Sequence, residues 1–171
     1  MLIHLRELYG KQDKAHISDK LDISDIVSNH LSMNSAGLVQ TEADAIFEAG
    51  RVRVNAHVHV DLELICSRCL VVFEDPLVFS YTELFSNETP KEDEEPADKD
   101  DTVNYVTEDK ISLVPYTKEH ILLELPMFPL CSDHCKGLCP TCGVNLNDEA
   151  CNCTKELTDP RWSGLKGFLS K

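Results

Sequence analysis

The sequence contains no uninterrupted run of about 18 apolar residues, the length that reads as a bilayer-spanning helix. It also lacks the marks of a secretory signal peptide. Its first residues, MLIHLRELYGKQDK, carry early charges and have neither a long apolar segment nor a small-residue cleavage site. We therefore expect no membrane association and a cytoplasmic protein, in a compartment where thiols stay reduced.

A basic surface is also missing. The 171 residues include 16 Lys+Arg and 30 Asp+Glu, which gives a net charge of -14. The excess is concentrated in residues 81–109, which hold 2 basic and 11 acidic side chains. Because no cluster of cations is available to displace counterions from phosphates, charge does not favour tight binding of RNA or DNA. Basic proteins are the expected partners of such an acidic chain.

The most acidic stretch, SNETPKEDEEPADKDD (86–101), has two prolines and no apolar cluster. Such a segment buries too little surface to offset its ordering entropy, so we expect a disordered loop. A role in contacting basic partners is the functional alternative.

Catalytic motifs are absent as well. The sequence has no nucleophile elbow, no glycine-rich phosphate loop and no HExxH pair of histidines. We therefore expect a protein that is not an enzyme.

The clearest periodic pattern is RVRVNAHVHVDLELI (51–65), in which apolar and polar residues alternate without a slip. This alternation predicts a long antiparallel strand with one buried face. Residues 43–49 and 71–85 are also strand-like, and Gly50 marks a turn or bulge between the first two strands. The fold class predicted is α+β, an antiparallel meander that forms either an open sheet or a barrel.

Two segments have the pattern of short helices. LDISDIVSNHL (21–31) offers Asp22 or Ser24 as its N-cap. SLVPYTKEHILLELP (112–126) offers Ser112, places a proline in the first turn and ends at a second proline.

Residues 102–106 are consistent with one more strand. The predicted organisation is an α+β domain, a Cys-rich zinc-knuckle segment and a C-terminal helix, over residues 1–130, 131–157 and 158–171.

Six of the eight cysteines fall within residues 131–153. In a reducing compartment, this density indicates metal binding rather than disulfides. Cys139-Pro-Thr-Cys142-Gly has the form of a zinc knuckle, in which the glycine permits the positive φ of the turn. Cys151 and Cys153 complete a predicted four-thiolate site for Zn²⁺. A closed shell of this kind has a structural role, since it leaves no open position for water.

The remaining cysteines are Cys66, Cys69, Cys131 and Cys135. One interpretation pairs them in a second zinc site, which requires residues about 60 positions apart to meet. Alternatively, Cys66 and Cys69 are small buried residues at a strand end, or a redox pair. Sequence leaves these alternatives open, and with them the number of zinc ions.

Three histidines lie near these features. His134 sits among the cysteines, and His57 and His59 lie on the polar face of the predicted strand. We interpret His134 as a bystander and the other two as part of a solvated face.

Several stretches together resemble the YceD family, named for large ribosomal RNA subunit accumulation. They are CSRCL (66–70), VPYTKEHILLELP (114–126), CKGLCPTCGVNLN (135–147), CNC (151–153) and DPRWSGLKGFL (159–169). The resemblance implies a bacterial cytoplasmic factor that supports synthesis, processing or stability of 23S ribosomal RNA during ribosome assembly. It carries no established enzymatic activity, and it implies that zinc is a local stabiliser.

Two explanations are open for how an acidic protein could support ribosomal RNA. Its partners are basic ribosomal proteins or large-subunit assembly intermediates, with indirect contact to the RNA; or a local patch of Arg51, Arg53 and Arg68 touches RNA. We favour the first, because negative charge repels RNA at long range. An RNA-processing enzyme of nuclease type and a thiol-based redox or zinc sensor are the alternative functions. The direct partner, the assembly step and the oligomeric state are not predicted.

Overall fold

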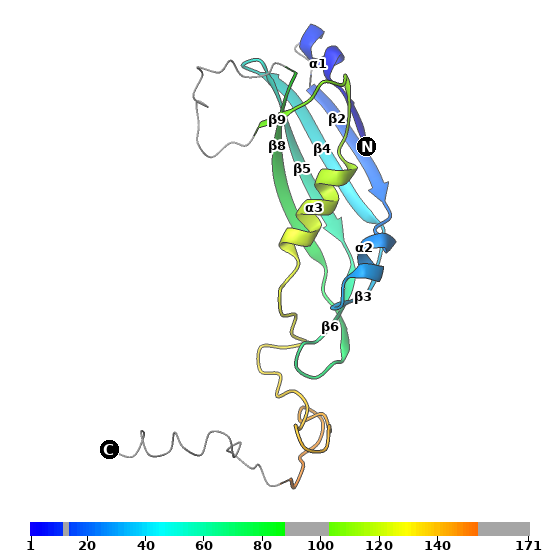
Figure 1. Cartoon of the computed structure of the whole chain (residues 1–171), viewed down its shortest axis with the longest axis vertical. Helices are drawn as coiled ribbons and strands as arrows, with labels where there is room; N and C mark the ends of the chain where they lie inside the picture. The colour runs from blue at the N-terminus through cyan, green and yellow to red at the C-terminus, as the bar shows by residue number, and fades with distance from the viewer. Residues whose placement is uncertain (12–13, 88–102, 154–171) are drawn as a thin grey trace, which may run out of the picture.

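The structure is a computed structural model that describes residues 1–11, 14–87 and 103–153 (Figure 1). In chain order its elements are β1 (Leu2–His4), α1 (Leu5–Lys11), β2 (Lys14–Leu21), α2 (Ser24–Asn29), β3 (Met33–Ala36), β4 (Val39–Glu48), β5 (Arg51–Val60), β6 (Leu62–Ile65), β7 (Val72–Glu74), β8 (Leu77–Ser86), β9 (Val103–Tyr105), β10 (Lys110–Ser112) and α3 (Val114–Glu124). The predicted α+β class is confirmed.

The largest sheet has the strand order β2-β4-β5-β8-β9. Its first three pairings are antiparallel, and β9 runs parallel to β8. The predicted meander is therefore present as β4-β5-β8. Among the described residues β2 and β9 lie at the two edges, so the sheet is open rather than closed into a barrel (Figure 1).

The strand predicted over residues 51–65 is divided in two. Its buried face is as predicted, since every second side chain from Val52 to Leu64 is buried. At Asp61, however, the backbone carbonyl accepts a hydrogen bond from the Gly37 N–H at 2.8 Å. There the chain leaves the large sheet, and β6 pairs with β3 and β7 in a separate three-stranded sheet. One continuous strand was therefore the wrong prediction.

The strand predicted over residues 71–85 is also interrupted. Asp75 donates its N–H to the Leu62 carbonyl at 2.9 Å, and Pro76 has no N–H to continue a ladder. The turn predicted at Gly50 is confirmed: Ala49 and Gly50 both have positive φ, 49° and 81°. Two such residues form the tight connection that matches the twist of antiparallel strands.

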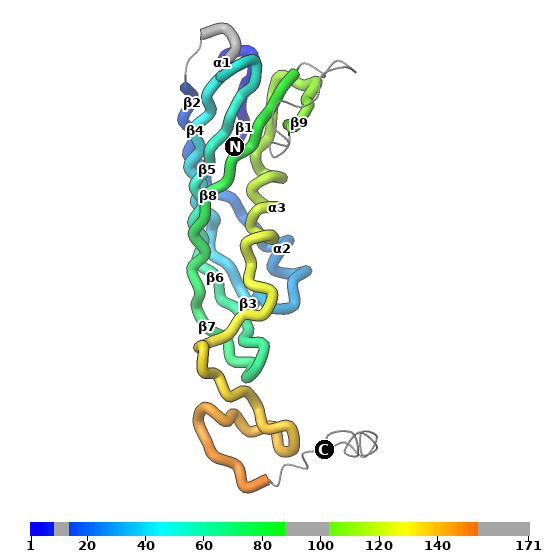
Figure 2. The backbone as a smooth tube through the Cα atoms, turned by 90° about the vertical axis from the view of Figure 1, so that its left-hand side faces the viewer, coloured from blue at the N-terminus to red at the C-terminus, as the bar shows by residue number. Residues whose placement is uncertain are grey.

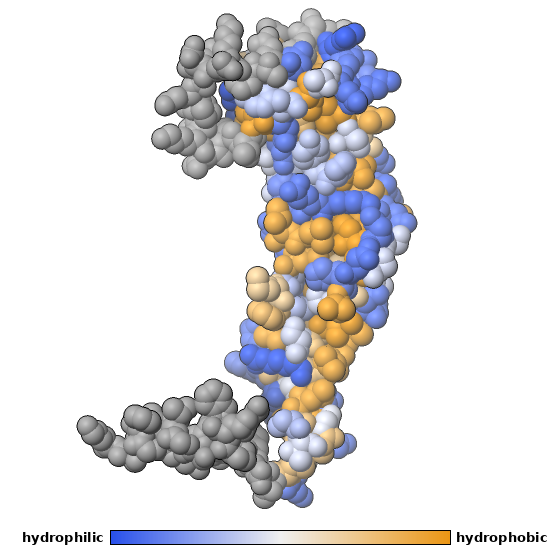
Figure 3. Space-filling view, viewed as in Figure 1, coloured by the Kyte–Doolittle hydropathy of each residue, from blue (hydrophilic) through white to orange (hydrophobic). Residues whose placement is uncertain are grey.

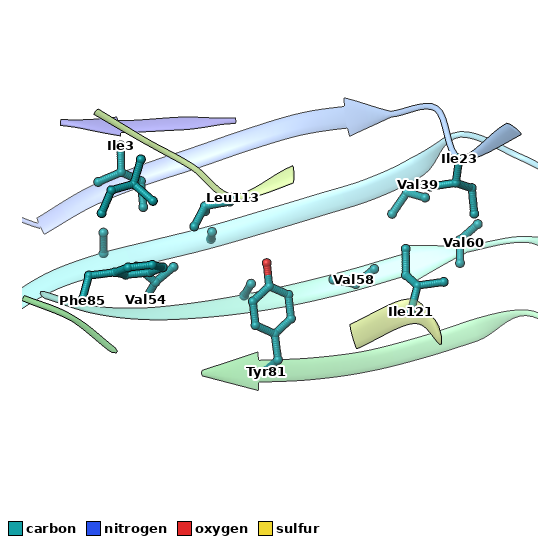
Figure 4. Packing of buried hydrophobic residues seen from close by; sticks show 14 of the residues in the cluster. Ile3, Ile23, Val39, Val54, Val58, Val60, Tyr81, Phe85, Leu113 and Ile121 are labelled. Atoms are coloured by element: carbon teal, nitrogen blue, oxygen red, sulfur yellow. The ribbon is translucent and has the colours of Figure 1, made fainter. Parts of the chain in front are cut away.

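One face of the large sheet is covered by α2 and α3 (Figure 2). The core lies between the sheet and these helices. It includes aliphatic side chains from β4 and β5, together with Phe85 of β8, Leu113 and Ile121 (Figure 4). The opposite face of the sheet carries the polar residues of the alternating pattern. This one-sided burial is what the alternation predicted.

Helix α3 differs from its prediction at its start. Ser112 belongs to β10, where it pairs with Leu2 of β1, so the helix begins at Val114 with Leu113 as its N-cap. Leu113 provides no side-chain cap, but the Ser112 hydroxyl accepts the N–H of Val114, the first helical residue, at 3.4 Å. Its end is as predicted, because Leu125 before Pro126 is extended.

Helix α2 is shorter than the predicted span of 21–31. Residues up to Leu21 belong to β2, and Ile23 is the N-cap without a side-chain cap. Asp22 accepts the Ser24 N–H at 2.8 Å, which forms a turn before the helix rather than capping it. Leu31, the last residue of the predicted span, lies beyond the helix and is 99% exposed.

The predicted strand over residues 102–106 corresponds to β9. The acidic segment lies outside the described residues from position 88 onward, and so does the C-terminal helix predicted over residues 158–171. The division into domain, knuckle and terminal helix stays a prediction. None of the described helices combines the length and apolarity needed to cross a bilayer.

Candidate metal centre

Four cysteines from two distant segments form the first cluster. Cys66 and Cys69 lie in the turn between β6 and β7, and Cys131 and Cys135 follow α3. The sulfurs of Cys66 and Cys135 are 3.8 Å apart, and those of Cys69 and Cys131 are 3.5 Å apart. The structure therefore brings together the two halves whose pairing the sequence left open.

A tight turn positions the first two of these thiols. The Leu70 N–H donates to the Cys66 carbonyl at 3.0 Å, and Leu70 has a φ of 60°. The adjacent Ser67 N–H donates to the Pro129 carbonyl at 2.8 Å, which holds the turn against the segment after α3. Both segments run side by side in Figures 1 and 2.

Beside the first cluster, the backbone of Gly137 approaches Arg68 closely. Gly137 has a φ of 74°, and a Cβ at this position would lie 3.1 Å from the Arg68 carbonyl oxygen. That carbonyl accepts the Leu138 N–H at 3.2 Å, while the Arg68 guanidinium donates to the Cys135 carbonyl at 2.9 Å. Glycine is required here both for the backbone conformation and for the space.

The second cluster consists of Cys139, Cys142, Cys151 and Cys153, the four predicted zinc ligands. The Gly143 N–H donates to the Cys139 carbonyl at 2.8 Å and Gly143 has a φ of 74°, as predicted for a knuckle. In each cluster the four sulfurs lie within 4.8 Å of one another. The first cluster is largely buried, whereas Cys142 of the second is exposed.

Both clusters fit a tetrahedral metal. Four sulfurs about 2.3 Å from a central zinc lie about 3.8 Å from one another, which agrees with the two sulfur–sulfur distances of the first cluster, 3.5 and 3.8 Å. Each cluster could thus hold a metal ion, and four thiolates leave no position open for water.

Backbone N–H groups lower the pKa of one thiol in the first cluster. Burial opposes ionisation of Cys66, but N–H groups of Cys131, Cys69 and Arg68 outweigh it and lower its pKa to about 6. The pKa of Cys131 rises to about 12, chiefly because its thiol hydrogen-bonds to Cys69 and is desolvated. An ionised sulfur next to a protonated one is a site from which a metal displaces protons.

The second cluster repeats this arrangement. Backbone N–H groups of Cys142 and Thr141 lower the pKa of Cys139 to about 6. The hydrogen bond to Cys142 and burial raise the pKa of Cys153 to about 12. In each cluster, backbone N–H groups therefore favour ionisation of one thiol.

Asn147 links the clusters. Its Nδ2 donates to the Cys135 sulfur at 3.3 Å, and its Oδ1 accepts the Lys136 N–H at 2.8 Å. Asn147 lies in the loop of the second cluster but touches a ligand of the first. Asn147, Gly137 and Leu70 were not predicted as site residues, because nothing local marks contacts between distant segments.

The histidines stay outside both clusters. His134 is exposed, the His57 Nδ1 hydrogen-bonds the Ser80 hydroxyl at 2.7 Å, and His59 lies 3.7 Å from Asp61. None of these three histidines belongs to either group of four cysteines.

The three arginines considered for RNA binding are not brought together. Arg51 and Arg53 lie at the start of β5, and Arg68 lies beyond the end of β6. At roughly 3.3 Å per residue, about 40 Å of extended chain separates Arg53 from the end of β6. Arg53 also lies 3.7 Å from Glu48. They form no single patch.

The chain matches one protein family. The sequence model of YceD, described as "Large ribosomal RNA subunit accumulation protein YceD", matches residues 54–169. This range includes all eight cysteines. No solved structure matches the chain significantly.

Relatives come from bacteria and plants. An uncharacterized protein of Mycobacterium tuberculosis is 36% identical over 104 residues, which are 61% of this chain and 49% of the relative. Large ribosomal RNA subunit accumulation protein YCED homolog 1, chloroplastic, of Arabidopsis thaliana is 30% identical over 153 residues, with 74% of this chain and 47% of the relative covered. The uncharacterized protein YlbN of Bacillus subtilis is 27% identical over 154 residues, with 90% and 87% covered.

The chain spans about half the length of the mycobacterial and Arabidopsis relatives. The family match nevertheless covers well over half of this chain and both cysteine clusters. The chain therefore belongs to the YceD family of large ribosomal RNA subunit accumulation proteins.

Proposed function

We propose that this chain is a non-enzymatic factor for accumulation of large-subunit (23S) ribosomal RNA, acting in the cytoplasm during assembly of the large ribosomal subunit. The observation that carries the proposal is the family match over residues 54–169. A plant relative bears the name of the same process.

We further propose that both clusters bind zinc with a structural role. An all-thiolate donor set favours zinc over harder cations such as Mg²⁺. Among the described residues, these two clusters are also the only groups of three or more His, Cys, Asp or Glu side chains gathered closely enough to hold an ion. A nuclease needs carboxylates and an open metal position, so this gathering supports a binding protein over an enzyme.

The proposed route to ribosomal RNA is indirect, through basic ribosomal proteins or assembly intermediates. The net charge of -14 disfavours approach to RNA. The dispersal of Arg51, Arg53 and Arg68 removes the local patch that direct binding would use.

The second cluster suggests one other role, that of a thiol or zinc sensor. Cys142 is exposed, so an oxidant or a competing chelator reaches this cluster first. Treatment with dilute hydrogen peroxide, followed by mapping of disulfides, tests this role. Zinc loss with a disulfide within the second cluster would favour it.

The main proposal is tested by deleting the gene and measuring the ratio of 23S to 16S ribosomal RNA. We expect the ratio to fall in the deletion strain and to recover when the full chain is supplied. An unchanged ratio would contradict the proposed function. Growth at low temperature, which slows assembly, sharpens the comparison.

A further inference from the structure

The two knuckle turns, residues 66–70 and 139–143, share one backbone geometry but differ in the residue that follows the second cysteine. In each, the residue after the second cysteine donates its N–H to the carbonyl of the first, at 3.0 Å for Leu70 and 2.8 Å for Gly143. Both residues have positive φ, 60° and 74°. Glycine adopts this conformation without strain, whereas leucine does not.

Leu70 does not pack in the core of the chain. Its side chain is 63% exposed, so it contributes little to the core. A strained leucine that faces solvent indicates a residue held for function, as left-handed non-glycine residues often are. What it offers is an apolar side chain projecting from a rigid turn.

Other exposed apolar residues lie near it. Val71 and Val72 follow Leu70 and are each nearly half exposed, and Met127 and Phe128 in the neighbouring segment are 84% and 72% exposed. The hydrogen bond from Ser67 to Pro129 joins the two segments, and the first cluster takes two cysteines from each.

Figure 3 shows orange surface, interspersed with blue and white, in the region of α3 and below it, and Leu122 and Leu123 of α3 are 47% and 71% exposed. A concentration of exposed apolar side chains in one region marks an interaction site more often than a solvated face.

We propose that Leu70, Val71, Val72, Met127 and Phe128 form a protein-docking surface, the knuckle surface, whose partner is a basic protein segment carrying apolar anchors. This inference rests on the proposed function and specifies its partner. Because the surface draws on both segments that contribute cysteines to the first cluster, a metal bound by those cysteines would hold the docking surface together.

Acidic residues near the knuckle surface favour a positively charged partner. Glu74 and Asp75 follow Val72, Glu124 precedes Met127, and all three are exposed. With the net charge of -14, these carboxylates repel phosphates and attract lysine and arginine side chains. A basic protein segment with apolar residues satisfies both the apolar centre and the acidic residues near it, whereas the phosphates of RNA are repelled by those residues.

The test is photo-crosslinking of the zinc-loaded full chain. The photoreactive p-benzoylphenylalanine replaces Phe128, a conservative change of one aromatic residue for another. The matched control places it at Leu38, which is 58% exposed and lies between β3 and β4. The probe is a mixture of purified large-subunit ribosomal proteins and 23S ribosomal RNA from the source organism.

We expect position 128 to form adducts with one or a few basic ribosomal proteins, identified by mass spectrometry, at least tenfold above position 38. An adduct mainly with RNA, an adduct between two copies of the chain, an adduct within the chain, or equal yields at both positions would overturn the proposal.

A second variant, Leu70→Gly, separates docking from folding. It should lower the adduct yield at position 128 at least fivefold while leaving the thermal midpoint unchanged or raised, because glycine relieves the strained turn. An unchanged yield would remove Leu70 from the docking surface.

Failure of the docking surface is distinguishable from failure of the proposed function. If deletion of the gene lowers the 23S to 16S ratio but position 128 gives no protein adduct, only the docking surface is wrong. If deletion leaves the ratio unchanged, the proposed function is wrong whatever the crosslinks show.

Discussion

Two glycines with the same φ allow the energy of the contact between Gly137 and the Arg68 backbone to be measured. Gly137 and Gly143 both have a φ of 74°, but a Cβ at Gly143 would meet nothing within 4 Å. At Gly137 it would lie 3.1 Å from the Arg68 carbonyl oxygen and 3.3 Å from the Arg68 Cβ. Alanine at Gly143 therefore tests the backbone conformation alone, and alanine at Gly137 tests conformation and contact together.

The expected magnitudes follow from this difference. An L residue in the left-handed region costs roughly 1–2 kcal/mol, which is the whole effect expected for Gly143→Ala. Gly137→Ala adds overpacking against backbone, about 1 kcal/mol more, because the Arg68 carbonyl is fixed by the Leu138 N–H at 3.2 Å. Metal binding and folding of such segments are one equilibrium.

The assay is zinc transfer to a chromophoric chelator of known affinity. Since about 1.4 kcal/mol corresponds to tenfold in affinity, we expect Gly143→Ala to weaken one zinc by roughly tenfold. Gly137→Ala should weaken one zinc by roughly 30- to 100-fold. Equal effects of the two substitutions would refute the close approach of Gly137 to the Arg68 backbone. They would also refute the proposed packing of the two segments that form the first cluster.

Three further changes test other parts of the structure. Cys66→Ser should lose one zinc and Cys142→Ser the other, each variant keeping one zinc by native mass spectrometry and an unaltered sheet by circular dichroism. Asn147→Ala should weaken zinc in the first cluster about tenfold in the chelator assay, because it removes the donor to the Cys135 sulfur. Burial raises the pKa of Tyr81 above 10, so its contribution to stability is complete below pH 10 and is lost as the pH rises further. Tyr81→Phe should lack this alkaline loss in chemical denaturation, yet be about 1 kcal/mol less stable at neutral pH without the bond to Thr117.

Local patterns predicted the elements that local forces determine. The alternation over residues 51–65 identified the buried face of β5 and β6, since period two follows from the strand itself. Gly50 and Pro126 were placed correctly because glycine and proline act on the backbone where they stand.

The features that escaped prediction depend on distant partners. β2 (Lys14–Leu21) has mostly polar, exposed side chains and is a strand because it pairs with β4. The break at Asp61 arises from the hydrogen bond donated by Gly37. No local sequence signal near Cys66 and Cys69 indicates that Cys131 and Cys135 lie beside them.

The two cysteine clusters also differ in how far local sequence predicts them. The second cluster is nearly contiguous in sequence, so the spacing of its cysteines was enough to predict its members. The first cluster joins the sheet to the segment after α3, and only the fold shows it. The positive φ of the exposed Leu70 is likewise visible only once the backbone conformation is known.

The central claim, two four-thiolate zinc sites in one chain, is tested most directly by native mass spectrometry of the full chain purified without chelator. The account predicts two zinc ions per chain, with all eight cysteines free of disulfides. A single zinc would contradict it by leaving one cluster without metal, and none, with disulfides in either cluster, would contradict it entirely.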